Sequence, residues 1–127
     1  MSLTLYASSS ATDTDFTSTL VDVHPDGAAI ILCEGILRAR FQESIERPVL
    51  MEPGTVYELR IDMWETSIVF KAGHRIRLEV SSSNFPRFDR NPNTGHQPGL
   101  DAEMRVADQT VYHDATRPSH LTLPVIE

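Results

Sequence analysis

The chain has 127 residues, of which 40% are hydrophobic and 23% charged, which is the composition of a folded domain and not of a disordered chain. Its formal net charge of −7 argues against nucleic acid or an anionic membrane surface as a partner. No apolar run reaches the roughly 18 residues of a membrane span, and the N-terminus lacks the pattern of a signal peptide. We therefore expect one cytoplasmic domain spanning residues 1–127.

The first half of the sequence predicts strands separated by turns. Apolar and polar side chains alternate over residues 3–7 and 16–23, and Pro25-Asp26-Gly27 has the composition of a turn. Residues 28–33 form a short apolar run, which favours a strand buried on both faces or at the centre of a sandwich. Gly35 then predicts a bulge or bend before a further strand over 36–41.

The second half of the sequence continues in the same way. Residues 55–64 and 76–80 alternate clearly, whereas 66–70 is short and mixed. Residues 104–113 and 121–126 are strand-like, with a turn predicted over 114–119 between them. No segment has a helical stripe of ten residues, and about seven strands separated by Gly, Pro, Asn and Asp indicate an all-β antiparallel sandwich or jelly roll.

The loop over residues 82–93 contains prolines, phenylalanines and arginines. Pro86 and Pro92 disfavour a helix there. Phe85 and Phe88 stand where polar side chains would be expected, so we predict that this loop packs onto the chain's own core or onto a partner. Its arginines, Arg87 and Arg90, are of the residue type enriched at protein interfaces.

The sequence shows no self-sufficient active site. It has no G-x-S-x-G elbow, and the serines 81–83 are better explained as solvated hydroxyls at a strand end. The five histidines lack the spacing of a zinc site, and no glycine-rich loop for a phosphate or cofactor is present. Asp13-Thr14-Asp15 resembles the start of a calcium loop, but the later ligands do not follow, so a turn capped by its own side chains is expected. Cys33, the single cysteine, is predicted to be a buried and unreactive thiol.

Several separated motifs in order carry a resemblance to a known family. The stretches are LYASSSATDTDFTSTLVDVHPDG, CEGILRARFQES and LMEPGTVYELRIDMWETSIVFKAGHRIRLEVSSSNFPRFDRNPNTG. They resemble the C-terminal jelly roll, a galactose-binding-domain-like sandwich, of the CocE/NonD serine hydrolases (the cocaine esterase and X-Pro dipeptidyl-peptidase family). The resemblance implies an α/β-hydrolase domain and a helical cap as partners, both upstream of the sandwich. No residue of the family's catalytic triad has a counterpart in this chain, which suggests an N-terminally truncated part of such an enzyme.

These observations predict a non-catalytic domain that braces the hydrolase and cap domains and is inactive alone. Phe85, Arg87, Phe88 and Arg90 are the candidate interface residues. No catalytic, cofactor-binding or metal-binding residue is assigned, and a homodimer through an exposed sheet edge is expected. An independent carbohydrate- or ligand-binding module is the alternative, although one tryptophan and three tyrosines provide few rings for stacking on sugars. A stand-alone hydrolase is a third possibility.

Overall fold

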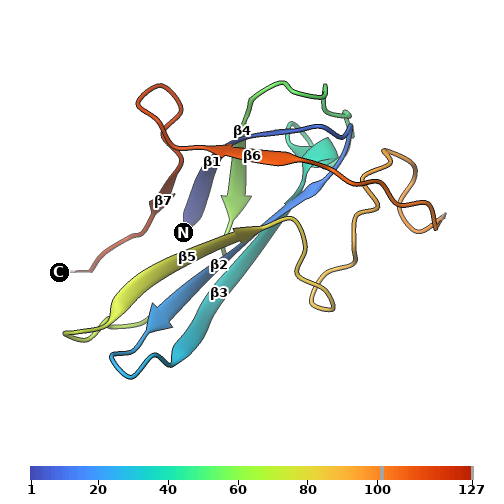
Figure 1. Cartoon of the computed structure of the whole chain (residues 1–127). Helices are drawn as coiled ribbons and strands as arrows, with labels where there is room; N and C mark the ends of the chain where they lie inside the picture. Colours follow the sequence, from blue (N-terminus) through green and yellow to red (C-terminus); the bar gives the residue numbers. More distant parts are fainter. Residues whose placement is uncertain (101, 127) are drawn as a thin grey trace.

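The computed structural model describes residues 1–100 and 102–126, and its regular elements are strands apart from one short 3-10 turn (Figure 1). The strands are β1 (Ser2–Ser9), β2 (Asp15–Val23), β3 (Ala29–Arg38), β4 (Tyr57–Asp62), β5 (Arg75–Ser81), β6 (Gln109–Tyr112) and β7 (His120–Thr122), and the 3-10 turn η1 covers Ala39–Phe41. Seven strands and an all-β fold are therefore confirmed. In the part of the chain that the structure describes, no helix is long and apolar enough to cross a bilayer.

Two antiparallel sheets form the sandwich (Figure 1). In one, β2 lies between β3 and β5. In the other, β1 pairs with β4 on one side, and β6 and β7 share its other side end to end. The Ser119 hydroxyl lies between β6 and β7, where it accepts a hydrogen bond from the Tyr6 N–H at 2.8 Å and donates to the Tyr112 carbonyl.

The core is built from the alternation that the sequence displays. Side chains on one face of β1 and β4 meet those of β2, because successive strand residues point to opposite faces. The buried apolar cluster comprises Leu3, Leu5, Ala7, Phe16, Leu20, Leu59, Ile61 and Met63.

Residues 28–33 were predicted to form a buried strand, and this prediction is wrong. This run and the following candidate form one continuous strand, β3, which lies at the edge of its sheet. Ile30 is 49% exposed and Ile31 is 61% exposed. The run is apolar on both sides, but no neighbouring strand or layer of the described chain covers this end of the sheet.

Gly35 does not mark the bulge. The register shift between β2 and β3 lies at Leu20/Val21 and leaves Leu32 without a partner. Gly35 instead lies where β3 passes close to the other sheet, because a Cβ there would be 2.3 Å from the Asp62 carbonyl oxygen. Of the other candidates, residues 66–70 form no strand, and the last two strands are shorter than expected.

Candidate functional site

The loop over residues 82–93 is anchored to β3 through Glu34. The Asn84 side-chain amide donates a hydrogen bond to Glu34 Oε1 at 2.6 Å. Arg87 Nε lies 3.5 Å from Glu34 Oε2. The Phe88 N–H closes a turn onto the Asn84 carbonyl at 3.1 Å. One carboxylate on the edge strand therefore holds the first half of the loop.

Each phenylalanine of the loop is paired with an arginine. The Arg90 guanidinium carbon lies 4.5 Å from the centre of the Phe85 ring, and that of Arg87 lies 5.6 Å from the Phe88 ring. Such cation–π contacts are worth about 0.5–1 kcal/mol at exposed sites. Phe85 remains 56% exposed. The structure thus brings the four candidate interface residues together in two pairs on the surface.

Trp64 lies beside this loop and was not among the candidates. It lines a shallow hollow of about 370 Å³ together with Arg87, Phe88, Cys33 and Glu34. The Trp64 backbone N–H donates to Asp62 Oδ1 at 2.9 Å, and the residue is 75% exposed. The available signal was that the chain's single tryptophan ends the polar side of its predicted strand, which is an unusual position for a large apolar ring.

Cys33 forms part of the wall of this hollow and is half-buried. Burial raises the pKa of the Cys33 thiol above its ordinary value. A raised pKa lowers the thiolate fraction at neutral pH. The predicted burial of Cys33 is thus only partial, and its lack of reactivity stays a prediction.

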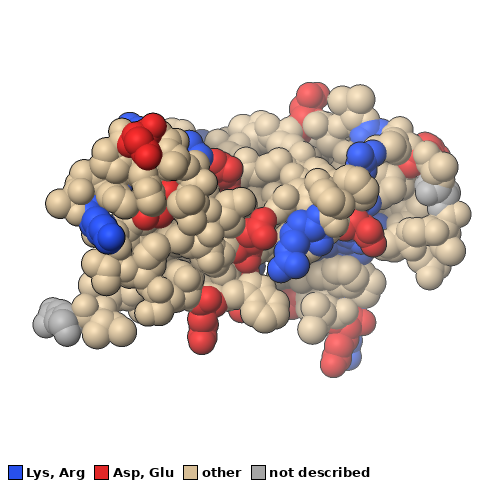
Figure 2. Space-filling view, turned by 90° about the horizontal axis from the view of Figure 1, so that it is seen from below, with Lys and Arg blue, Asp and Glu red and all other residues tan. Residues whose placement is uncertain are grey.

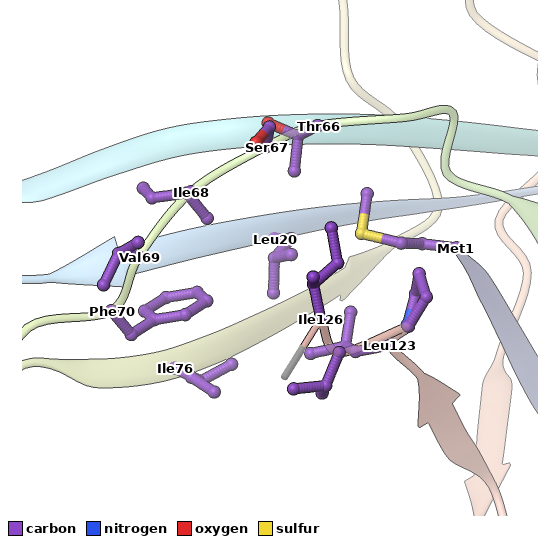
Figure 3. Close-up of a pocket in the computed structure, with 12 residues that line it drawn as sticks. Met1, Leu20, Thr66, Ser67, Ile68, Val69, Phe70, Ile76, Leu123 and Ile126 are labelled. Carbon is purple, nitrogen blue, oxygen red and sulfur yellow. The ribbon is translucent and has the colours of Figure 1, made fainter.

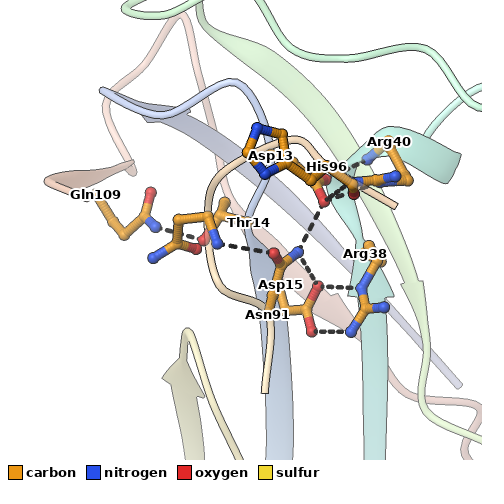
Figure 4. A network of polar contacts seen from close by, with 9 residues as sticks. Asp13, Thr14, Asp15, Arg38, Arg40, Asn91, His96 and Gln109 are labelled. Atoms are coloured by element: carbon orange, nitrogen blue, oxygen red, sulfur yellow. Dashed lines mark hydrogen bonds and ion pairs between the residues drawn. The ribbon is translucent and has the colours of Figure 1, made fainter. Parts of the chain in front are cut away.

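Behind the loop, two aspartates and two arginines form a buried ionic network (Figure 4). Asp13 precedes β2, Asp15 begins it, Arg38 ends β3, and Arg40 lies in η1. Arg38 binds Asp15 in a bidentate manner at 2.9 and 3.0 Å, and this contact raises the pKa of the Arg38 guanidinium. Arg40 donates to Asp13 through its backbone N–H at 3.0 Å and through Nε at 2.9 Å. The Asn91 amide bridges the two carboxylates at 2.9 and 2.8 Å.

The network corrects the expectation for Asp13-Thr14-Asp15. These carboxylates do not cap their own turn but accept hydrogen bonds from Arg38, Arg40 and Asn91. Asp13 and Asp15 are 0% and 1% exposed, so their charges need these partners. The network holds the far end of the 82–93 loop, just as Glu34 holds its start.

An apolar groove of about 440 Å³ lies at the opposite end of the sandwich (Figure 3). Leu20 and Ile76 from the three-stranded sheet line it, together with Phe70 and Ile126 from two irregular segments. Leu20 belongs to the buried core, whereas Val69, Ile76 and Ile126 of the lining are exposed apolar side chains, which is typical of a contact surface.

Acidic and basic side chains are interspersed on the face shown in Figure 2. Arg87 of the loop, for example, lies beside the Glu34 carboxylate.

Three side chains of types that bind metals converge at one end of β2 and β5, although no metal site was predicted from the sequence. The ligand atoms of Asp22, His24 and His74 lie within 4.8 Å of one another. His74 follows His24 by 50 residues in the sequence, so only the pairing of β2 with β5 brings them together.

Comparisons with known proteins agree with this architecture. Residues 1–122 match the family model described as the X-Pro dipeptidyl-peptidase C-terminal non-catalytic domain. The chain is 51% identical to cocaine esterase of Rhodococcus sp. (strain MB1 Bresler) over 129 residues, covering all of this chain and 22% of that protein. The chain thus spans about a fifth of the length of this relative.

Solved structures show the same relationship. An aminopeptidase from a marine sediment Thaumarchaeota archaeon superposes with a TM-score of 0.87 at 34% identity, over 93% of this chain and 21% of that chain. An α-amino acid ester hydrolase superposes with a TM-score of 0.78 at 29% identity, again over 93% and 21%. The fold is that of a β-sandwich found as a part of larger hydrolases. The chain belongs to the family of X-Pro dipeptidyl-peptidase C-terminal non-catalytic domains, as the resemblance to CocE/NonD hydrolases predicted.

Proposed function

We propose that this chain is the C-terminal part of a serine hydrolase that acts on ester or amide bonds, and that it braces the hydrolase and cap domains of that enzyme. The observation that carries the proposal is that the whole chain corresponds to only about a fifth of a cocaine esterase to which it is 51% identical. The missing four-fifths would supply the catalytic groups. A cytoplasmic location for the enzyme is part of this proposal.

We assign the domain contact to the surface formed by Phe85, Arg87, Phe88, Arg90 and Trp64. Exposed aromatic rings paired with arginines, beside a tryptophan-lined hollow, have the composition of interface hot spots. The loop is fixed at both ends, by Glu34 and by the buried network, so little conformational entropy would be lost on docking. The apolar groove around Leu20 and Ile76 supports a second area of contact with the parent enzyme.

The alternative of an independent carbohydrate-binding module is not favoured. The galactose-binding-like description rests on the sandwich architecture alone, and the matched family is one of hydrolase C-terminal domains. Calorimetric titration with simple sugars should give no saturable heat.

A chimera tests the proposal. The last fifth of Rhodococcus cocaine esterase is replaced by this chain, and the turnover of p-nitrophenyl acyl esters is measured beside that of the isolated chain. We expect the chimera to be active and the isolated chain to give no turnover above background, because the catalytic groups come from the upstream domains. Turnover by the isolated chain, abolished by a serine-directed inhibitor, would instead support a stand-alone hydrolase.

The assigned surface is tested in the same chimera. Phe85→Ala and Trp64→Ala should each destabilise it by about 1–2 kcal/mol, measured as a lower Tm, if these rings are buried at the domain contact. Leu100→Ala is the matched control, because Leu100 is 72% exposed and lies outside this surface. Equal Tm values for all three variants would place the contact elsewhere.

A further inference from the structure

Asp22, His24 and His74 come together at one end of the three-stranded sheet through the register of β2 and β5. Val23 pairs with Arg75, so the continued antiparallel register places His24 opposite His74. Asp22 and His24 are two residues apart, so their side chains leave the same face of the strand. The two imidazole centroids are 4.3 Å apart.

Two turns fix the backbone at both histidines. The His24 N–H donates to the Ala28 carbonyl at 2.8 Å, and the Gly27 N–H donates back to the His24 carbonyl at 3.0 Å. Gly27 has a φ of 92°, which favours glycine at this position. The His74 N–H donates to the Lys71 carbonyl at 3.0 Å. The imidazoles therefore project from ordered backbone at the strand ends.

The Asp22 carboxylate contacts both imidazoles. Its oxygens are both 2.9 Å from His74 Nδ1, and Oδ2 is 3.4 Å from His24 Nε2. Asp22 is 4% exposed, whereas the His24 side chain is 36% exposed. A small ion would thus find a buried anionic ligand with a route from solvent past His24.

We propose that Asp22, His24 and His74 form a binding site for a divalent transition-metal ion, for which Zn²⁺ is the best-suited example. Zinc binds imidazole nitrogen and carboxylate oxygen at about 2.0–2.2 Å, which separates neighbouring ligand atoms of a tetrahedron by about 3.4 Å. The separations of 2.9 and 3.4 Å around the Asp22 carboxylate are close to this value. Two histidines and one aspartate leave a fourth position for water.

A simple Asp–His hydrogen bond would also join β2 to the start of β5, so loss of stability on substitution does not separate the two interpretations. Only a metal site makes the stability depend on the ion. The experiment therefore uses the full chain without an affinity tag, treated with a chelator and dialysed, and titrates it with ZnCl₂ by calorimetry. We expect saturable binding of one ion per chain, and a Tm that rises with the zinc concentration.

Variants locate the ion. His24→Ala should weaken zinc binding by more than about tenfold, because a direct ligand is lost. His24→Gln repeats the test with a larger polar side chain, should the alanine variant unfold. His113→Ala is the control, since it removes an exposed imidazole outside the cluster and should leave the Kd unchanged.

Cobalt provides a second readout. Co²⁺ bound by two imidazoles and a carboxylate should show visible absorption bands in the native chain that are lost in the His24 variants. No saturable zinc binding, or an equal Kd in the native chain and both His24 variants, would overturn the proposal.

Discussion

Gly35 shows how closely the two sheets approach one another. A Cβ at this position would lie 2.3 Å from the Asp62 carbonyl oxygen and 2.9 Å from Ile61 Cγ2. The first of these atoms belongs to the backbone of β4 and cannot move aside by a change of rotamer. Only glycine allows β3 and β4 to pack at this distance.

Gly35→Ala should therefore destabilise the chain by about 2–3 kcal/mol, because the sheets must separate or twist to admit one methyl group. Urea unfolding followed by circular dichroism measures the loss. Gly99→Ala is a useful comparison: its Cβ meets no atom within 4 Å, but its φ of 79° imposes backbone strain worth about 1 kcal/mol. If both variants lose the same free energy, the close approach at Gly35 is not a constraint.

Asp114 illustrates a local electrostatic effect on the surface. Hydrogen bonds from Arg117 and Thr116 hold the pKa of the Asp114 carboxyl well below its ordinary value of 3.8. Because the folded-state pKa is lowered, these bonds contribute stability above the ordinary pKa. That contribution is lost as the pH falls through the folded-state pKa.

The titration of Asp114 can be followed by NMR of its carboxyl carbon. We expect a midpoint well below 3.8 in the native chain, and a midpoint moved upward in Arg117→Ala, since Arg117 is the largest cause of the shift. Arg105→Ala is the control, because Arg105 pairs with Glu103 instead. An unchanged midpoint in Arg117→Ala would contradict this assignment.

The strands were predictable from their alternation, since the period of two is imposed by the pleat. In β1 and β4 the alternation also predicts the side chains that form the core, whereas β2 is buried on both faces and β5 is exposed along most of its length. The alternation of apolar and polar residues could not predict which strands lie at the edge of a sheet. Residues 28–33 therefore suggested a buried strand, whereas Ile30 and Ile31 are exposed on the edge strand β3.

The same limit applies to the candidate site. Prolines and aromatics in unexpected positions predicted an irregular loop over residues 82–93 and made it the candidate interface, because these are local signals. The partners of Asp15 and of His24 are distant in the sequence, at Arg38 and His74. Their pairing depends on strand register, which the sequence does not display.

The exposed edge of β3 predicts self-association of the isolated chain. β3 pairs with β2 on one side, and its apolar residues Ile30 and Ile31 remain open on an edge that could add a strand from a second copy. We expect a homodimer by light scattering. Ile31→Lys should raise its Kd by at least about tenfold, because a lysine on an edge strand opposes pairing.

Val106→Lys is the matched control for this substitution, since Val106 is 95% exposed and lies outside the strands. A wild-type chain that remains monomeric at high concentration would refute edge pairing. A dimer that resists Ile31→Lys would place the contact on another edge.

The ionic network connects segments from the whole length of the chain. Asp13 lies between β1 and β2, and Asp15 is the first residue of β2. Arg38 is the last residue of β3, Arg40 lies in η1, and Asn91 lies in the long loop that leads to β6. Arg40 also donates to the His96 carbonyl at 2.7 Å, and Gln109 of β6 donates to Thr14 Oγ1 at 2.6 Å. Both sheets and the 82–93 loop thus share one buried polar centre.

Asp15→Ala should consequently destabilise the whole fold and not one strand alone. It would leave the Arg38 guanidinium without its bidentate partner, and loss of one member of a buried ion pair costs about 3–5 kcal/mol. Against a total stability of about 5–15 kcal/mol, this loss is large enough to unfold a marginal domain. Asp15→Asn keeps the shape and should cost less, which provides a measurable variant if the alanine form does not fold.

The control is Glu79→Ala, which removes a carboxylate from the half-exposed pair with Arg77 and should cost about 1 kcal/mol or less. Urea unfolding gives the three free energies, and hydrogen exchange shows where protection is lost. Because Asp15 contacts both β3 and the loop residue Asn91, protection should fall in β2, β3 and residues 91–96 together. If protection were lost in β2 alone, the network would stabilise only that strand and would not join the two sheets and the loop.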